Sequence, residues 1–260
     1  MSEAGGTVRQ ETVGRVSKII IDNPGKKNAL SPEMMRSLSD ALTELDDNDD
    51  LWVGVVCAEG EHFTAGLDMP KFFGPGATAK PLPEENVDPL GLGKKCRKPI
   101  VTAVQGICYT VGPEMMLAGD IVVAAADARF CQMEAKRGIA PLGGAHFRYI
   151  TRAGWGNAMY HLLLCDEFGA DEAYRVGLVQ EVVPVGEQVA RAMHLAETIA
   201  RNAPIGIQAT KAAARTFIEQ GEASAIAAVG DVRRRVMASE DMKEGIMSFM
   251  QRRPANFTGK

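Results

Sequence analysis

Two glutamates in apolar parts of the sequence could carry out acid–base chemistry. Glu114 stands between Pro113 and Met115, and Glu134 follows Met133 further along the chain. Loss of water around a carboxyl group raises its pKa toward neutrality, which suits a group that donates or accepts protons. If both side chains face one pocket, they could act as acid and base on a single substrate.

Each glutamate also has a simpler interpretation. Glu114 could be a first-turn residue stabilised by the helix dipole, and the residues support this as well as they support catalysis. Glu134 is followed by Lys136 and Arg137, so the residues alone favour a surface salt bridge. A helix leading away from Glu114, a returning strand and a turn at Ala126-Asp127 could bring the two glutamates together.

Two short segments could supply backbone donors to a negatively charged oxygen. Pro113 is typical of the first residue of a helix, so the Val111 and Gly112 amides would lie at a helix N-terminus with unpaired N–H groups. Small residues in the AGLD run at 65–68 would let a ligand approach the Leu67 amide. Such amides could stabilise a carbonyl oxygen that becomes an oxyanion, although AGLD alone is also typical of a plain turn.

The first half of the chain mixes predicted strands with a predicted helix. Apolar, β-branched runs predict strands at 16–21, 52–57, 100–104 and 121–125. A helix is predicted from Ser31-Pro32, an N-cap residue followed by a first-turn proline. We expect the acidic run at 46–50, where this helix ends, to be solvated. Residues 72–93 are rich in Pro and Gly and are predicted to be an irregular lid, pocket wall or surface loop.

The second half of the chain is predominantly helical. From about Gly143 only residues 178–183 predict a strand, and Ala-rich amphipathic stretches predict helices at 187–202, 204–220, 223–239 and 241–252. The sequence therefore predicts an α/β domain with a helical C-terminal appendage.

The composition excludes several classes of protein. A chain of 260 residues, of which 46% are hydrophobic and 24% charged, can bury a substantial core. Its net charge of −4 gives no general attraction to DNA or to an anionic membrane. The basic run at 94–98 is a candidate local anion site. No segment approaches the roughly 20 apolar residues of a membrane span, and residues 1–7 show no targeting pattern.

The cysteines and histidines indicate neither a metal site nor a disulfide framework. Five cysteines and four histidines are scattered without the spacing of a zinc site. We therefore expect reduced thiols and a cytoplasmic, unprocessed protein. Sequence signatures of serine hydrolases, P-loop enzymes, zinc peptidases and dinucleotide-binding proteins are also missing.

These segments stand in the order and spacing of the crotonase superfamily, the enoyl-CoA hydratase/isomerase family, which the chain resembles over nearly its whole length. Residues 22–30 resemble the family's N-terminal CoA-binding segment, residues 65–68 and 106–120 resemble its two oxyanion elements, and residues 249–257 resemble its C-terminal tail. Glu114 and Glu134 match the two glutamates of the hydratase branch.

The resemblance implies a fold, an assembly and a set of site residues. The implied fold is an α/β spiral of β-β-α turns over residues 1–200, with a helical region at 201–260 that serves trimerisation and CoA capping. A homotrimer or homohexamer is therefore implied. The implied catalytic residues are Glu114, Glu134, Leu67 and Val111. The implied CoA-binding residues are Lys27, Asn28, Ala29, Leu30, Ala65, Gly66, Asp68 and Gly112, with Phe249 and Arg252 meeting the CoA of a neighbouring subunit.

The implied reaction is hydration of a 2-enoyl-CoA thioester, as in fatty acid metabolism. The Leu67 and Val111 amides would polarise the thioester carbonyl. The two glutamates would hold and activate water, and one of them would exchange a proton with the α-carbon. Acyl-CoA is then the substrate, and no metal or redox cofactor is implied.

Three features depart from the family pattern. Thr110-Val111 replaces a run of glycines, which would narrow the pocket or distort the oxyanion hole. Lys136 and Arg137, if they point toward Glu134, would lower its pKa and favour a base over an acid. The loop at 141–146 keeps glycines where the family has a Pro-Gly-rich turn, but its composition is altered. Separately, methionines near the proposed site suit an adaptable acyl pocket, although methionine is more often core filler.

Other functions remain open at this stage. A Δ3-Δ2 enoyl-CoA isomerase can work with one glutamate, and an acyl-CoA hydrolase is a further possibility on the same fold. The altered oxyanion run and the basic run at 94–98 motivate a non-catalytic CoA- or RNA-binding homologue. Acyl chain length, pathway and the choice between trimer and hexamer are not determined by the residues.

Overall fold

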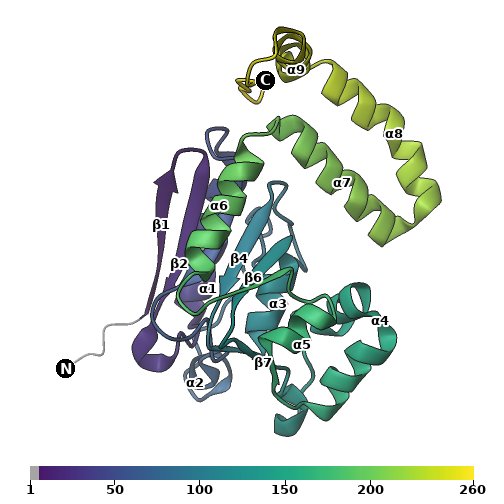
Figure 1. Ribbon diagram of the computed structural model, residues 1–260. Coiled ribbons are helices and arrows are strands. Elements are labelled where there is room, and N and C mark those ends of the chain that lie inside the picture. Colours follow the sequence, from purple (N-terminus) through teal and green to yellow (C-terminus); the bar gives the residue numbers. More distant parts are fainter. Residues whose placement is uncertain (1–5) are drawn as a thin grey trace.

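A six-stranded sheet forms the centre of the molecule, which a computed structural model describes for residues 6–260 (Figure 1). In spatial order the strands are β1 (Thr7–Val13), β2 (Val16–Asp22), β3 (Val53–Ala58), β4 (Ile100–Val104), β6 (Ile121–Ala125) and β9 (Glu181–Val183). β1 pairs antiparallel with β2, and the other pairs are parallel. Four predicted strands are confirmed, and the fifth is shorter than expected. β1 was not predicted, because most of its side chains are exposed and it lacks an apolar run.

Helices cover both faces of this sheet. α1 (Pro32–Asp47) packs on one face and α6 (Gln188–Ala200) on the other (Figure 1). On β2, Ile19 and Ile21 belong to the core under α1, whereas Ile20 belongs to the core under α6. A parallel sheet covered in this way must be apolar on both faces. This explains why the strands are continuous apolar runs rather than alternating ones.

The chain alternates between the central sheet and a second, three-stranded sheet made of β5 (Ile107–Tyr109), β7 (Arg129–Cys131) and β8 (Phe168–Gly169). It passes from β4 to β5 and then into helix α3 (Val111–Ala118). It next passes from β6 to β7, through the 3-10 turn η2 (Glu134–Arg137), into helix α4 (Ala145–Leu164). This repeat of strand, strand and helix confirms the expected spiral.

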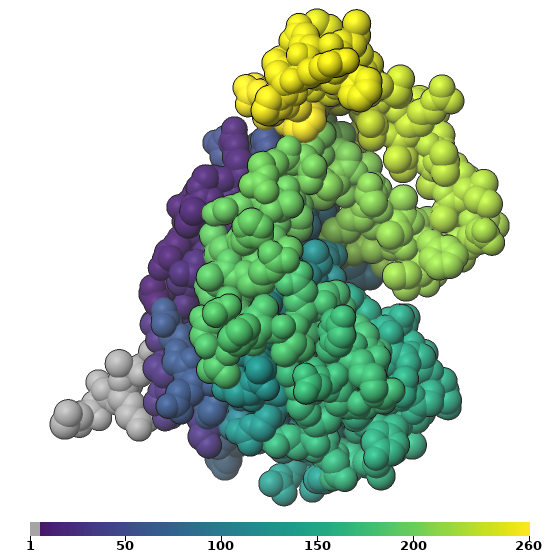
Figure 2. Space-filling model, in the orientation of Figure 1, coloured from purple at the N-terminus to yellow at the C-terminus, as the bar shows by residue number. Residues whose placement is uncertain are grey.

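The remaining helices are η1 (Pro24–Lys26), α2 (Met69–Phe73), α5 (Ala170–Arg175), α7 (Pro204–Gln220), α8 (Glu222–Met237) and α9 (Glu240–Gln251). The four predicted C-terminal helices are confirmed. α4 was not predicted, because Gly154 interrupts it with a φ of 73° and its apolar residues do not follow one stripe. In Figure 2 the α7–α8 hairpin stands away from the body, with a hollow between it and the α4 region.

Two expectations concern membranes and targeting. None of the helices within residues 6–260 combines the length and apolar character needed to cross a membrane. The expectation that no targeting segment is present was based mainly on residues 1–5, which lie outside the described residues.

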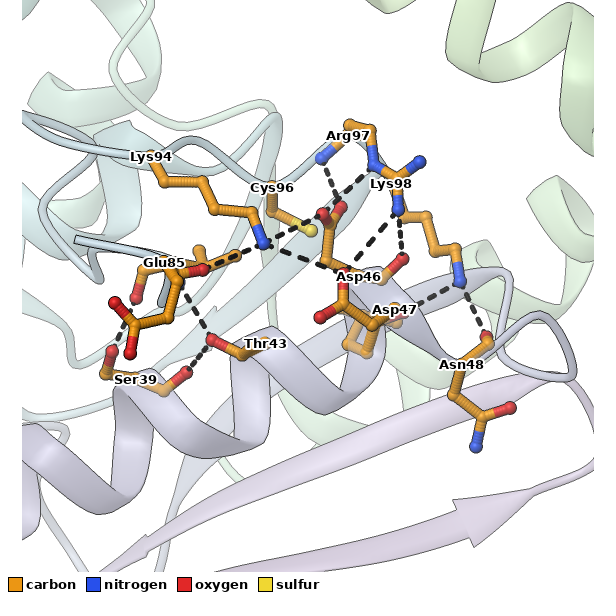
Figure 3. A network of polar contacts seen from close by, with 12 residues as sticks. Ser39, Thr43, Asp46, Asp47, Asn48, Glu85, Lys94, Cys96, Arg97 and Lys98 are labelled. Carbon is orange, nitrogen blue, oxygen red and sulfur yellow. Dashed lines mark hydrogen bonds and ion pairs between the residues drawn. The ribbon is translucent and has the colours of Figure 1, made fainter. Parts of the chain in front are cut away.

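The end of α1 is fixed by a buried carboxylate, which corrects the expectation of a solvated acidic run (Figure 3). Asp46 has no exposed surface. Its Oδ1 accepts from the Arg97 backbone N–H at 2.6 Å and its Oδ2 from Arg97 Nε at 3.0 Å. Burial by itself would raise the pKa of Asp46, but the bonds from Arg97 outweigh it and hold the pKa below its usual range.

The basic run at 94–98 is occupied by contacts within the chain and does not form a free anion site. Lys98 is buried, and its Nζ donates to the Leu45 and Asn48 carbonyls at the end of α1 (Figure 3). Lys94 donates to the Glu85 carbonyl, and Lys95 pairs with Glu219. Cations at a helix C-terminus complement its dipole. The basic run therefore has a structural role, and it no longer supports the hypothesis of RNA binding.

Asp46→Ala should therefore destabilise the protein. We expect the free energy of unfolding to fall by about 2–3 kcal/mol at pH 7, because a buried charge-assisted network is broken. The loss should shrink as the pH falls through the depressed pKa of Asp46, since protonation removes the same interaction from the wild type. Urea denaturation at several pH values measures this. The control Asp47→Ala, at an exposed position, should change stability by about 0.5 kcal/mol or less, and an equal loss in both variants would contradict the proposed role of Asp46.

Candidate active site

A short backbone ladder leaves the Leu67 amide without a protein partner. The Leu30 N–H donates to the Gly66 carbonyl at 2.9 Å, and the Asp68 N–H donates to the Leu30 carbonyl at 2.8 Å. In such a parallel bridge, the residue opposite Leu30 points its own N–H away from the ladder. Leu67 is that residue, and its N–H makes no hydrogen bond within residues 6–260.

Asn28 holds this ladder in place. Its side chain is fully buried and donates to the Glu59 and His62 carbonyls at 2.8 and 2.6 Å, while its Oδ1 accepts from the Asn23 N–H. Asn28 has a φ of 55°, a conformation that asparagine tolerates better than most residues. Its side chain is thus committed to the protein, so a ligand could meet only the backbone at this position.

The Val111 amide is presented by a second ladder. The Thr64 N–H donates to the Ile107 carbonyl at 3.0 Å, and the Tyr109 N–H donates to the Thr64 carbonyl at 3.0 Å. The chain then turns at Thr110 into α3, so the Val111 N–H is the first of the helix and has no partner within the described residues. Segment 64–68 therefore lies between the two ladders and connects the Leu67 and Val111 donors.

Thr110 adopts a strained backbone conformation between these donors. Its φ is 51° and its ψ is −108°, which is unfavourable for a β-branched residue. Its N–H is held by the Cys131 carbonyl at 2.9 Å. A Cβ added at Gly66, whose φ is 116°, would overlap Thr110 Oγ1. The absence of a side chain at Gly66 therefore leaves the space that the Thr110 side chain occupies.

Glu114 is buried and held by two backbone amides. Its side chain is 4% exposed, and its Oε1 accepts from the Gly143 N–H at 2.6 Å and the Ala145 N–H at 3.2 Å. Burial raises the pKa of Glu114, while the two amides and the nearby Arg148 act in the opposite direction. A side chain at Gly143 would overlap the carboxylate. Glu114 is thus a fixed carboxyl group, not a surface residue that merely complements a dipole.

Glu134 is also buried, which overturns the surface salt bridge that the residues alone favoured. Its side chain is 8% exposed, and its Oε2 has no hydrogen-bond partner within the described residues. Lys136 instead pairs with Asp166 at 3.0 Å, and Arg137 is exposed. Burial raises the pKa of Glu134 to about 7, with a further contribution from the Glu114 charge. The expectation that Lys136 and Arg137 lower this pKa is therefore wrong.

The two glutamates have environments that separate their proton affinities. Glu114 has two amide donors from the 143–145 turn, so it ionises more readily. Burial and the Glu114 charge raise the pKa of Glu134 to about 7, and only its own backbone N–H acts in the opposite direction. Such a pair can act as base and acid at the same pH. The predicted path between them is confirmed: helix α3, strand β6 and a turn at 126–127 connect the two residues.

The structure brings together most of the predicted site residues but separates the tail from them. Lys27 is exposed, Ala29, Ala65 and Asp68 are half-buried, and Gly112 is buried against Cys108 and Thr64. Phe249 and Arg252 lie on or just after α9, at the end of the molecule opposite α2 and β7 (Figure 1). Within one chain, therefore, the tail residues are not part of this site.

Sequence reasoning missed the groups that support Glu114. The glycines of the 141–146 loop were noticed, but not that the Gly143 and Ala145 amides bind the carboxylate. Arg148 was also missed, although it donates to the Gly143 carbonyl at 2.9 Å and the Leu90 carbonyl at 2.5 Å and so fixes both loops. The glycine pair before a helix could have signalled an anion-binding turn.

A cleft of about 660 Å³ lies apart from the glutamates, between the body and α7. It is lined by the far side of α3 and by α7 residues such as Lys211 and Arg215, and includes neither Glu114 nor Glu134. Two acidic side chains in its lining are already paired within the chain, Asp120 with Lys211 and Glu219 with Lys95. No group of His, Cys, Asp or Glu within residues 6–260 is arranged to hold a metal ion.

Sequence comparisons agree with this geometry. The family model described as "Enoyl-CoA hydratase/isomerase" matches residues 11–260. The chain is 30% identical over 267 aligned residues to the enoyl-CoA hydratase EchA19 of Mycobacterium tuberculosis, covering 99% of this chain and 98% of that protein. It is 29% identical to the crotonyl-CoA hydratase of Syntrophomonas wolfei, covering 95% of each.

Solved structures are similar over the whole chain. A probable enoyl-CoA hydratase/isomerase from Mycobacterium abscessus superposes with a TM-score of 0.94 at 42% identity, covering 98% of this chain and 99% of that one. An enoyl-CoA hydratase from Mycobacterium tuberculosis superposes with a TM-score of 0.89 at 32% identity, covering 97% and 99%.

Glu134→Gln should stabilise the protein at alkaline pH. Because the pKa of Glu134 rises from 4.5 to about 7 on folding, the folded state binds more protons than the unfolded state between these values, and wild-type stability falls as the pH rises through them. We expect the variant to exceed the wild type by about 2 kcal/mol at pH 8 and to match it near pH ~4. Chemical denaturation at both values tests this. Glu84→Gln, at an exposed position, should show no such dependence, and a Glu134→Gln variant that behaves like it would refute the raised pKa.

Proposed function

This chain belongs to the enoyl-CoA hydratase/isomerase family, and on that premise we propose that it adds water across the double bond of a 2-enoyl-CoA thioester. The observation that carries the proposal is the pair of buried glutamates with unequal proton affinities. They lie beside two segments whose amides have no protein partner. Binding of acyl-CoA follows from the family, and its contact with residues 27–30, 65–68 and 112 remains part of the proposal.

The Leu67 and Val111 amides would hold the thioester oxygen. Neither N–H has a hydrogen-bond partner among residues 6–260, so both can donate without first breaking a bond to that part of the chain. As charge moves onto the oxygen, preorganised donors stabilise the enolate more strongly than the ground state. This polarisation makes the β-carbon electrophilic.

The proton steps follow from the two carboxyl environments. Glu114, the more readily ionised group, would remove a proton from water as the water oxygen bonds to the β-carbon. The electron pair of the double bond moves into the enolate. Glu134, protonated near pH 7, would then deliver its proton to the α-carbon and restore the carbonyl. The product gains one hydroxyl and one hydrogen, and proton exchange with solvent resets both carboxyl groups.

Two further assignments are proposals of the same kind. Relatives named for crotonyl-CoA and 2,3-dehydroadipyl-CoA show that acyl groups of different length and polarity are used among similar proteins, so acyl preference must be measured. All five cysteines are buried and unpaired, which supports action in the reducing cytoplasm.

Glu114→Gln and Glu134→Gln should each abolish most of the activity. We expect kcat for crotonyl-CoA hydration to fall about 100-fold or more in each variant with KM little changed, because each removes one proton-transfer group. Wild-type activity should decline above pH ~7, where Glu134 loses its proton. The decrease in absorbance of the conjugated thioester measures the rate.

Matched controls distinguish hydration from the rival reactions. Glu197→Gln, at an exposed carboxylate on α6, should retain wild-type rates. Conversion of 3-enoyl-CoA by a protein that tolerates loss of one glutamate would favour the isomerase. Release of free CoA would favour the hydrolase, and no turnover of 2-enoyl-CoAs of several chain lengths would refute hydration.

A homotrimer or homohexamer is also proposed, because the C-terminal helices leave apolar surface uncovered. α8 has no buried residue, and its apolar side chains Ile226 and Val229 are 65% and 59% exposed. Phe249 on α9 is 85% exposed. Apolar side chains on helices that stand off the body are typical of a subunit interface, and a neighbour's tail could then reach the CoA.

Val229→Glu should weaken this assembly. We expect the wild type to have a mass of three or six times 27.9 kDa by light scattering, and the variant to shift toward the monomer, because a charge would be buried in the interface. Val185→Glu makes a similar change at a 63% exposed valine in the loop before α6 and should leave the mass unchanged. A monomeric wild type would refute the assembly.

A further inference from the structure

The hydroxyl of Tyr149 is buried without a hydrogen-bond partner. Tyr149 lies in the first half of α4, its side chain has no exposed surface, and its Oη contacts no donor or acceptor within residues 6–260. A hydroxyl removed from water costs free energy unless it is hydrogen-bonded. Phenylalanine would fill the same space without this cost, so the hydroxyl requires an explanation beyond packing.

Tyr149 lies on the helix whose first turn binds Glu114. Ala145, one helical turn earlier on the same face of α4, donates its N–H to Glu114 Oε1. Across from α4, the charges that act on Tyr149 include those of Glu134 and Glu114. The phenol therefore lies in the interior that the two carboxyl groups share.

Among the buried side-chain oxygens without a hydrogen bond, we consider Glu134 Oε2 as the partner of Tyr149, because the Glu134 charge acts on this tyrosine. Glu134 Oε2 is buried and has no hydrogen-bond partner within the described residues. Burial and the nearby carboxylates raise the pKa of Tyr149 well above its ordinary value, so the phenol keeps its proton and can donate. An unpaired donor and an unpaired acceptor thus lie in the same buried region.

We propose that Tyr149 is a positioning residue for Glu134, donating a hydrogen bond to its carboxylate when that group has given up its proton. The inference rests on the proposed hydration, in which negative charge develops on Glu134 as its proton moves to the α-carbon. A donor that is used only in that state stabilises the transition state and not the resting enzyme. It also keeps the ionised side chain oriented for reprotonation.

The other ionisable groups around Glu134 do not supply this donor. Lys136 pairs with Asp166, and Arg148 is bound to backbone carbonyls. The groups packed against this interior are Glu114 from α3, Cys108 from β5, Cys131 from β7, and His146, Arg148 and Tyr149 from α4. Cys131 donates instead to the Cys165 carbonyl, and Cys108 is a weak donor.

Tyr149→Phe tests the inference by kinetics. We expect kcat for crotonyl-CoA to fall about ten-fold, with KM changed less than about two-fold, because the lost bond forms only as Glu134 ionises. Without the donor the pKa of Glu134 rises, so the alkaline limb of the pH–rate profile should move to higher pH by about one pH unit. Tyr160→Phe, a 64% exposed tyrosine on the same helix, should change neither quantity. An unchanged kcat and alkaline limb in Tyr149→Phe would overturn the inference.

A stability measurement tests the same bond without any substrate. At pH ~5, where Glu134 is protonated, Tyr149→Phe should raise the melting temperature by about 2–4 °C, because an unpaired buried hydroxyl is removed. At pH 8 the gain should disappear, because the ionised carboxylate loses its donor. In a Glu134→Gln background the gain should be the same at both values. If Tyr149→Phe changes the melting temperature with the same pH dependence in the wild-type and the Glu134→Gln protein, the inference is overturned. If the wild type turns over no 2-enoyl-CoA but the melting temperatures follow the expected pH dependence, only the proposed function is overturned.

Discussion

A carboxyl group removed from water must find donors or keep its proton, and the arrangement around α3 depends on this constraint. Glu114 satisfies it with the Gly143 and Ala145 amides, and Glu134 satisfies it by holding its proton to about pH 7. The loop at 141–146 and the start of α4 surround the Glu114 carboxylate, and the turn η2 carries Glu134. The two glutamates therefore differ in proton affinity because of their surroundings.

The two amides proposed as oxyanion donors are left unpaired by the backbone geometry. Ladders on either side of segment 64–68 use the hydrogen-bonding groups of Leu30, Thr64 and Tyr109 and leave the Leu67 and Val111 amides unpaired. This geometry requires a strained backbone conformation at Thr110. The hydrogen bond from the Thr110 N–H to the Cys131 carbonyl stabilises that conformation, and Gly66 leaves room for the Thr110 side chain.

Away from the two glutamates, polar contacts fix the end of α1, and the C-terminal helices leave apolar side chains exposed. Asp46, Arg97 and Lys98 fix the end of α1 to the segment that precedes β4. The α7–α8 hairpin beyond them stands off the body with Ile226 and Val229 exposed. The proposed assembly would cover this exposed apolar surface.

The sequence by itself determined the elements whose signals are local. The N-cap at Ser31, the apolar runs of β2, β3, β4 and β6, and the four C-terminal helices were all predictable, because capping and periodicity act within a few residues. The order of motifs also indicated the family and the two glutamates. Only the tertiary structure decided that Glu134 is buried, that Lys136 pairs with Asp166 and that Asp46 is not solvated. Burial and ion pairing depend on residues that are distant in sequence. The pKa of Glu134 is therefore set by those residues and not by its sequence neighbours.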